Sequence, residues 1–140
     1  MAKKKGPHGR MVSEQFEAGL ALRRQVLGEA HVERSLKAGA EDDFMWPLQE
    51  IVTEVGWGAF WTRPGLTLKQ RSLLNIGMLT ALNRPHELEV HLRGALRNGL
   101  TKEEIREALL QTAAYCGLPA CIDAFRVAKK VIAEEEGKVG

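Results

Sequence analysis

Residues 83–99 have the sequence Asn-Arg-Pro-His-Glu-Leu-Glu-Val-His-Leu-Arg-Gly-Ala-Leu-Arg-Asn-Gly, which predicts one short helix with its own start and stop. Pro85 suits the first helical turn, where its missing N–H costs nothing, and Gly99 suits the left-handed position just past the end. Glu87 and His91 stand four residues apart, so both project from one side of this helix, beside its apolar stripe. A carboxylate and an imidazole so placed indicate a compact acid/base site, although a surface helix that carries charges there has the same pattern.

Helical signals dominate the rest of the chain, and no alternating strand of convincing length is present. Helices with an apolar face are expected over residues 11–28, 32–38, 44–55, 68–82, 102–116 and about 119–136. Two capping boxes, Thr67 with Gln70 and Thr101 with Glu104, mark helix starts. The sequence therefore predicts an all-α bundle whose helices are joined by short connections.

An aromatic-rich segment follows the helix expected at 44–55, which Asp42 or Asp43 would cap. Residues 56–65 hold three aromatic residues and three glycines, a composition typical of an irregular segment. Such a segment either plugs a core or lines a pocket or subunit contact. Trp57 is therefore a candidate for both roles.

The helix expected at 68–82 is apolar nearly all round, which places it in the middle of a bundle or at a subunit interface. Its polar exceptions, Arg71, Ser72 and Asn75, cluster near its start. A buried arginine must be paired with a counter-charge or face an anionic ligand. Arg71 is therefore a candidate for anion binding, with an intersubunit salt bridge as an equal alternative.

Length and charge limit the function classes. The chain of 140 residues fits one domain, expected over residues 11–136 between a mobile basic arm at 1–10 and a tail at 137–140. Its net charge of +2 is too balanced to favour nucleic acid as a partner. No apolar run is long enough to span a membrane, and no apolar stretch follows the basic N-terminal residues as in a secretory signal. We therefore expect a cytoplasmic protein with no membrane partner.

Cysteine and histidine spacing shows no redox or metal motif. Cys116 and Cys121 are separated by four residues, which is not the C-x-x-C of a redox pair or a zinc ribbon, and reduced thiols are expected. His86 and His91 point about 140° apart on one helix, so they are poor co-ligands. We expect no bound metal.

Several motifs, in order along the chain, resemble the carboxymuconolactone decarboxylase family. They are Trp57-Gly58, Arg63-Pro64-Gly65-Leu66, Arg71-Ser72-Leu73-Leu74, His91-Leu92-Arg93-Gly94-Ala95-Leu96, Asn98-Gly99, Glu103-Glu104-Ile105, Tyr115-Cys116-Gly117-Leu118-Pro119-Ala120 and Asp123-Ala124-Phe125-Arg126. The resemblance covers about residues 12–134. It implies an all-α, alkylhydroperoxidase-D-like bundle of five to seven helices that assembles as a homotrimer or homohexamer.

The wider superfamily contains alkylhydroperoxidase-D-type proteins, whose C-x-x-C-x-x-x-H motif carries two redox cysteines. When their histidine is aligned with His91, Arg84 and Glu87 stand where the cysteines would be. The chain then lacks the thiol nucleophile that dithiol peroxidase chemistry needs. The resemblance therefore favours a decarboxylase over a peroxidase.

The implied reaction is the loss of CO2 from 4-carboxymuconolactone, a small anionic lactone, in aromatic catabolism through protocatechuate and the β-ketoadipate pathway. The product is the 3-oxoadipate enol-lactone. The departing carboxylate lies next to a C=C that is conjugated with the lactone carbonyl, so the electron pair passes onto the carbonyl oxygen. Because the substrate carries this electron sink, no cofactor is expected. Trp57 would form part of the wall of the substrate pocket.

The resemblance and this chemistry together assign roles to charged side chains. His91 is the candidate proton donor or oxyanion partner, and Glu87 would hold its imidazole and favour the charged form. Arg71 is the first candidate for the substrate carboxylate, with Arg93 and Arg63 in reserve. The alternatives are structural roles for these side chains in a non-catalytic helical oligomer, or an enzyme for another small lactone acid.

Overall fold

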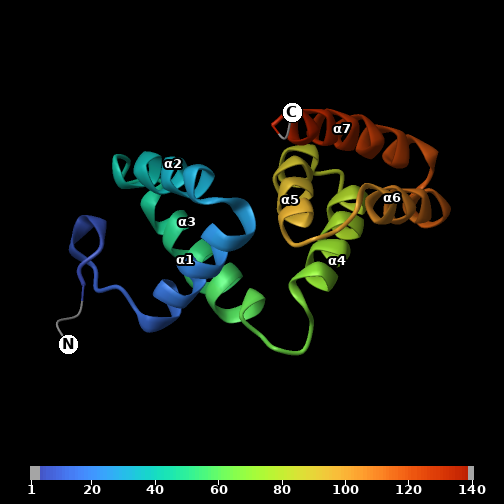
Figure 1. Ribbon diagram of the computed structural model, residues 1–140. Helices are drawn as coiled ribbons and strands as arrows, with labels where there is room; N and C mark the ends of the chain where they lie inside the picture. Colours follow the sequence, from blue (N-terminus) through green and yellow to red (C-terminus); the bar gives the residue numbers. More distant parts are fainter. Residues whose placement is uncertain (1–3, 139–140) are drawn as a thin grey trace. The chain divides into compact units, whose positions relative to one another are not determined.

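The computed structural model describes residues 4–138, which form seven α-helices, a 3₁₀-helix and a π-helix (Figure 1). Within these residues no strand occurs beyond an isolated β-bridge between Lys5 and Met11. The all-α class expected from the sequence is confirmed. The chain divides into two compact units, Met1–Gly65 and Leu66–Gly140, called unit 1 and unit 2 below. The single domain expected over residues 11–136 stays a prediction.

Unit 1 is built around one close helix pair. Its elements are η1 (Pro7–Gly9), α1 (Glu14–Leu27), α2 (Glu29–Ala40), α3 (Trp46–Ile51) and the π-helix η2 (Val52–Trp61). A Cβ atom on Gly19 of α1 would stand 2.2 Å from the carbonyl oxygen of Thr53. A Cβ atom on Gly58 of η2 would stand 2.4 Å from the carbonyl oxygen of Gln15. Glycine at both positions therefore permits the backbone-to-backbone contact of α1 with η2.

The aromatic segment differs from the irregular structure predicted for it. Residues 56–61 lie inside η2, which continues α3 without a break. Gly58 does not stop the helix, because its missing side chain is what the packing against α1 requires, and packing outweighs propensity. The expected aspartate cap is also wrong. Oδ1 of Asp42 accepts the N–H of Phe44 at 3.0 Å and closes a turn ahead of α3, whose first residue is Trp46.

The described part of the N-terminal arm folds back on itself. The N–H of Gly6 donates to the carbonyl oxygen of Arg10 at 2.8 Å. Nη1 of Arg10 in turn lies 3.0 Å from Oε2 of Glu50. The first three residues of the arm and the last two of the tail lie outside the described residues. The mobility expected of the arm stays a prediction.

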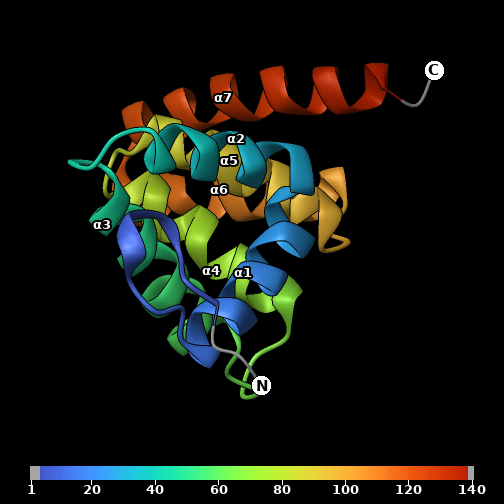
Figure 2. The ribbon, with the colours of Figure 1, turned by 90° about the vertical axis from the view of Figure 1, so that its left-hand side faces the viewer.

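Unit 2 is a four-helix bundle of α4 (Leu68–Ala81), α5 (Pro85–Arg97), α6 (Lys102–Cys116) and α7 (Leu118–Gly137). Figure 2 shows α7 along its whole length of 20 residues. Both α5 and α6 pack against α4 and against α7. The core that joins the four helices consists of Ile76, Leu88, Leu92, Ala95, Leu100, Ile105, Leu109, Ala124, Ala128 and Val131. The apolar stripe of the helix predicted at 83–99 therefore faces this core.

Local signals set the ends of the unit 2 helices as predicted. Oγ1 of Thr101 accepts the N–H of Glu104 at 3.0 Å, and Oε2 of Glu104 accepts the N–H of Thr101 at 2.8 Å. The capping box expected at the start of α4 is also formed. Pro85 is the first residue of α5, and Gly99 beyond its end has a φ of +94°. These backbone groups are satisfied within a few residues, so their sequence signals are reliable.

Helix α4 packs against α5, α6 and α7 but is not buried on all sides in the single chain, so the prediction of a central helix holds for one face only. Leu74 is 54% exposed and Met78 is 45% exposed, whereas the polar Ser72 and Thr80 are buried. The exposed residues of α4 and neighbouring residues of α6, including Tyr115, line an open apolar groove of about 470 Å³. The subunit interface and the homotrimer or homohexamer stay predictions.

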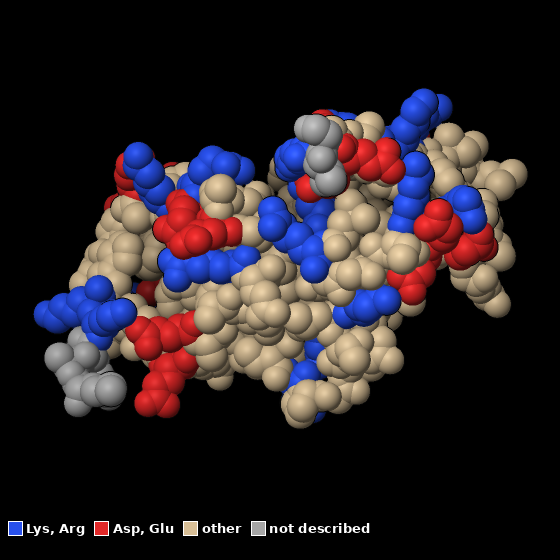
Figure 3. Space-filling model, viewed as in Figure 1, with Lys and Arg blue, Asp and Glu red and all other residues tan. Residues whose placement is uncertain are grey.

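None of the helices within residues 4–138 is long and apolar enough to cross a membrane. Basic and acidic side chains are interspersed on the surface shown in Figure 3, in keeping with the net charge of +2. The expectations of a cytoplasmic location and of no nucleic-acid partner stay predictions.

Candidate functional site

Polar side chains from two helices meet where α4 packs on α5 in unit 2. His91 of α5 is half-buried, and its Nδ1 lies 3.4 Å from Nδ2 of Asn75 on α4. Glu87 stands one helical turn before His91, and Arg71 stands one turn before Asn75. The structure thus brings His91 to Asn75, with Glu87 one turn from His91 and Arg71 one turn from Asn75.

Burial decides the charge of His91. Loss of solvent around the ring lowers the pKa of His91 to about 4, and the nearby Glu87 carboxylate offsets only part of this effect by raising it. The imidazole is therefore neutral at pH 7. The sequence suggested that Glu87 would favour the charged form of the imidazole, but burial outweighs the carboxylate. A neutral imidazole retains one N–H donor and one acceptor.

Glu87 acts on His91 through space rather than by holding its ring. The carboxylate is exposed in the first turn of α5, and among residues 4–138 it forms no hydrogen bond. The expected hydrogen bond between the Glu87 carboxylate and the imidazole is therefore not formed within the described residues. Its place near the N-terminus of the helix is favourable for an anion.

Arg71 lies on the side of α4 that carries Asn75. The two residues are four positions apart, so their side chains project from one face of the helix, and both are half-buried. The planar fork of a guanidinium matches a carboxylate, which is the reason for predicting that Arg71 binds an anion. The role of Arg71 in anion binding stays a prediction.

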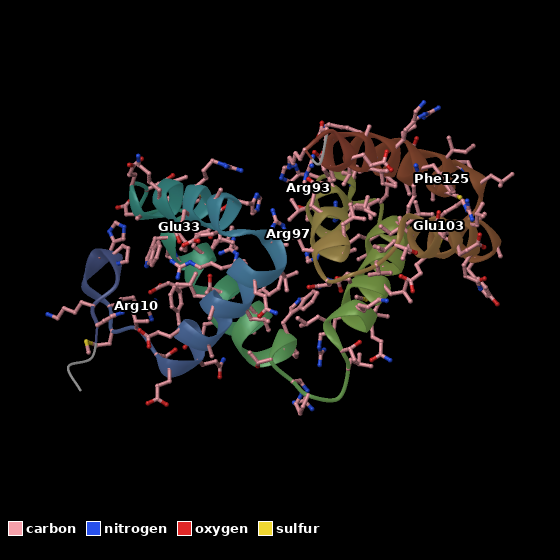
Figure 4. The ribbon with its side chains drawn as sticks, viewed as in Figure 1. Arg10, Glu33, Arg93, Arg97, Glu103 and Phe125 are labelled. Atoms are coloured by element: carbon pink, nitrogen blue, oxygen red, sulfur yellow. The ribbon has the colours of Figure 1, made fainter. Side chains whose placement is uncertain are left out.

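Arg93 is engaged elsewhere and does not join His91. Nη2 of Arg93 lies 3.0 Å from Oε1 of Glu89, and Nη1 lies 2.9 Å from Oε1 of Glu135 on α7. Glu134 also accepts from Nη2 (Figure 4 labels Arg93 on α5). Burial lowers the pKa of Arg93, but the three carboxylates together raise it above its ordinary value. Because Arg93 is two residues from His91, it projects from the other side of α5.

Trp57 lies on η2 and is buried. Its side chain is 4% exposed and stacks on Trp61, with ring centroids 4.7 Å apart and an interplanar angle of 24°. This placement favours the core role over the pocket role, and a part of Trp57 in substrate binding stays a prediction. Arg63, the other reserve arginine, follows η2 as an exposed residue.

Thiols and metal ligands do not cluster in the part of the chain that the structure describes. Both cysteines are free thiols, and Sγ of the buried Cys121 lies 3.2 Å from the carbonyl oxygen of Leu109. Within residues 4–138 no group of three histidine, cysteine, aspartate or glutamate side chains converges. The sequence-based expectation of no metal stays a prediction.

In the sequence, Asn75 stands out only as a polar exception in an apolar helix, and no role is predicted for it. Its signal was its place four residues after Arg71, on a helix where other polar side chains are few. The residue that it meets lies on another helix, so only the packing of α4 on α5 reveals the contact.

Comparison with known proteins identifies the family of the chain. Residues 47–130 match the carboxymuconolactone decarboxylase family. The chain is 47% identical over 117 residues to nitrosuccinic acid decarboxylase of Metarhizium robertsii, which covers 84% of this chain and 80% of that protein. It is 42% identical over 118 residues to 4-carboxymuconolactone decarboxylase of Acinetobacter baylyi, which covers 84% of this chain and 87% of that protein. Two relatives named as decarboxylases support a carboxy-lyase activity. The chain belongs to the carboxymuconolactone decarboxylase family.

Proposed function

We propose that this chain is a carboxy-lyase that removes CO2 from 4-carboxymuconolactone and releases the 3-oxoadipate enol-lactone without a cofactor. The observation that carries the proposal is His91, a desolvated imidazole held beside Asn75 at the contact of α4 with α5. The 42% identity to a 4-carboxymuconolactone decarboxylase over 84% of the chain supports the choice of substrate.

The chemistry of the substrate sets the tasks of the protein. The departing carboxylate is bonded to a ring carbon next to a C=C that is conjugated with the lactone carbonyl. When this C–C bond breaks, CO2 leaves and the electron pair moves through the double bond onto the carbonyl oxygen. The dienolate then takes a proton on the carbon next to the carbonyl. The protein must bind carboxylates, stabilise the developing oxyanion and allow protonation.

We assign the stabilisation of the oxyanion to His91. With a pKa of about 4 the imidazole is neutral at pH 7. Its single N–H then donates a hydrogen bond to the developing oxyanion. One donor aimed at a developing oxyanion lowers the barrier by about 3 kcal/mol in a desolvated site. A bound dianion also raises the pKa of a neighbouring imidazole, which keeps His91 a candidate for the proton transfer.

We assign the binding of a substrate carboxylate to Arg71. A guanidinium binds a carboxylate through two parallel hydrogen bonds, so it orients the anion as well as attracting it. Glu87 is one turn from His91 and repels a second anion, so it favours a pose in which the carboxylates point toward Arg71. Arg93 has no part in this pose, because its guanidinium is shared among three carboxylates.

The 47% identity to a nitrosuccinic acid decarboxylase favours nitrosuccinate as a second candidate substrate. In nitrosuccinate the carboxylate leaves from the carbon that bears the nitro group, and the electron pair moves onto the nitro oxygens. A second carboxylate remains on the product, as it does in the lactone acid. The same arginine and neutral imidazole suit both anions, because each needs a carboxylate partner and a donor at an oxygen that becomes negative.

Turnover of the two acids tests the proposal. Purified protein is mixed with 4-carboxymuconolactone or with nitrosuccinate, and the loss of substrate is followed by ultraviolet absorbance while released CO2 is measured. We expect turnover of the lactone. Turnover of nitrosuccinate alone would select the second candidate, and turnover of neither acid would overturn the proposal.

Variants on α5 test the role of His91. His91→Ala is expected to lower kcat by roughly 10²–10³-fold, as for loss of one oxyanion donor. The matched control is His86→Ala, an exposed histidine on the same helix, which should keep the wild-type rate. Equal rates for wild type and His91→Ala would remove His91 from the mechanism.

Arg71→Lys tests the carboxylate assignment, because it keeps the positive charge but loses the planar fork. We expect KM to rise roughly tenfold, which corresponds to about 1.4 kcal/mol of binding free energy. An unchanged KM for both Arg71→Lys and Arg71→Met would assign the carboxylate to another residue.

A further inference from the structure

The side-chain amide of Asn75 faces one of the two ring nitrogens of His91. Its amide nitrogen Nδ2 lies 3.4 Å from Nδ1 of His91, and both side chains are half-buried where α4 packs on α5. An amide nitrogen donates hydrogen bonds and does not accept them. The tautomer that fits this contact is the one in which Nδ1 of His91 accepts with its lone pair and carries no proton.

A neutral imidazole has one N–H, and the contact with Asn75 leaves it on Nε2. We propose that Asn75 is a positioning residue that fixes His91 in the Nε2–H tautomer and so makes Nε2–H the donor to the oxygen that becomes negative during decarboxylation. The identity of that oxygen rests on the proposed function. The tautomer is a property of the resting protein and needs no substrate.

The charged groups around the pair agree with this assignment. Glu87 on α5 lies one turn before His91, and Arg71 on α4 lies one turn before Asn75. Within the described residues Glu87 forms no hydrogen bond, so its carboxylate does not accept the ring proton from either nitrogen. Asn75, and not the carboxylate, supplies the hydrogen bond to Nδ1.

A neutral amide suits this position better than an acid would. A carboxylate at position 75 only accepts hydrogen bonds, so it would draw the proton to Nδ1 and favour the charged imidazolium. Asparagine leaves the ring neutral and its proton on the opposite nitrogen. Asn75→Asp therefore reverses the hydrogen bond with almost no change in side-chain size.

The tautomer is measured directly by nuclear magnetic resonance of protein with ¹⁵N-labelled histidine at pH 7. Protonated and unprotonated ring nitrogens have different chemical shifts, and the chain has four histidines to resolve. The signals of His91 are those that disappear in His91→Gln. We expect a protonated Nε2 and an unprotonated Nδ1 in the wild-type protein. A protonated Nδ1 in the wild type would overturn the proposal.

Two variants test whether Asn75 is the cause. Asn75→Asp is expected to move the proton to Nδ1, and Asn75→Ala to produce a mixture of tautomers. The matched control is Asn98→Ala, which removes another asparagine that joins α5 to α4, through a 2.8 Å hydrogen bond to Ser72. The control should keep the wild-type tautomer. A wild-type spectrum for Asn75→Ala would contradict the proposal.

Kinetics separate positioning from support of the fold. Asn75→Asp and Asn75→Ala are expected to lower kcat roughly 10–100-fold, the usual cost of removing a residue that orients a functional histidine. KM should stay within about threefold, because Asn75 acts on the reaction step and not on the bound carboxylate. Wild-type kcat in Asn75→Asp would overturn the proposal. A wild-type protein that shows the expected tautomer but acts on neither acid would instead contradict the proposed function.

Discussion

The side-chain amide of Asn98, at the end of α5, donates a hydrogen bond to the buried hydroxyl of Ser72 on α4, with 2.8 Å between Nδ2 and Oγ. The same Nδ2 lies 3.3 Å from the carbonyl oxygen of Leu68. Asn98 therefore ties the end of one helix to the first turns of another. Asn98→Ala is expected to lower the free energy of unfolding by about 1–3 kcal/mol, because the Ser72 hydroxyl stays buried without this partner. Urea unfolding followed by circular dichroism measures the change.

The control for this prediction is a double-mutant cycle. Ser72→Ala in the Asn98→Ala background should cost much less than Ser72→Ala in the wild type, since the hydroxyl has already lost its partner. Additive losses would show that the two side chains do not stabilise each other.

The capping box of α6 contributes to the free energy of unfolding. Thr101 supplies the hydroxyl that accepts the N–H of Glu104, so Thr101→Ala leaves that N–H without a protein partner. The free energy of unfolding should fall by about 0.5–2 kcal/mol. Thr101→Ser keeps a capping hydroxyl and is expected to recover most of the loss. Equal losses in the two variants would assign the effect to packing of the methyl group.

The low pKa of His91 predicts how the stability of the protein depends on pH. The pKa of His91 is about 4 in the folded protein and near its ordinary 6.5 when unfolded, so between these values the unfolded chain binds more protons. The contribution of His91 is complete above pH 6.5 and is lost as the pH falls toward 4. It amounts to about 3 kcal/mol.

His91→Gln isolates this contribution, because glutamine is polar and does not titrate. The free energy of unfolding is measured from pH 7 to pH 4 for both proteins, and carboxylates contribute equally to each. The wild type should lose more stability than the variant over this window. Parallel pH profiles would show that His91 is not desolvated in the folded protein.

Glu87→Gln tests the through-space effect of the carboxylate. Glu87 raises the pKa of His91 against the larger effect of burial, so removing its charge should lower that pKa further. A titration of the ring nitrogens of His91 by nuclear magnetic resonance measures the shift. An unchanged pKa would mean that solvent screens the pair completely.

The carboxylates around Arg93 predict a salt-sensitive stabilisation of unit 2. Arg93→Met removes the partner shared by Glu89, Glu134 and Glu135, while Lys130 still lies 3.1 Å from Oε1 of Glu89. We expect a loss of about 1–2 kcal/mol at low salt, summed over partly exposed pairs. The difference between wild type and variant should shrink at high ionic strength. A difference that is independent of salt would assign it to lost packing of the side-chain stem.

The sequence predicted the local parts of unit 2 correctly and part of unit 1 wrongly, for one physical reason. Pro85, Gly99 and the threonine caps act on backbone groups within a few residues, so their effect does not depend on the fold. The glycines of residues 56–65 favoured an irregular segment. Gly58 is instead helical, because the backbone of Gln15 on α1 packs so closely against it that no side chain fits. Long-range packing is absent from any local pattern.

The sequence by itself determined the all-α class, the ends of the unit 2 helices and the placement of Glu87 and His91 on one side of α5, because caps and helical periodicity are local. Only the tertiary structure decided that His91 is neutral and meets Asn75, and that Arg93 is occupied by acidic residues of its own helix and of α7. These outcomes depend on solvent exclusion and on side chains from other helices, and both arise only when the helices pack.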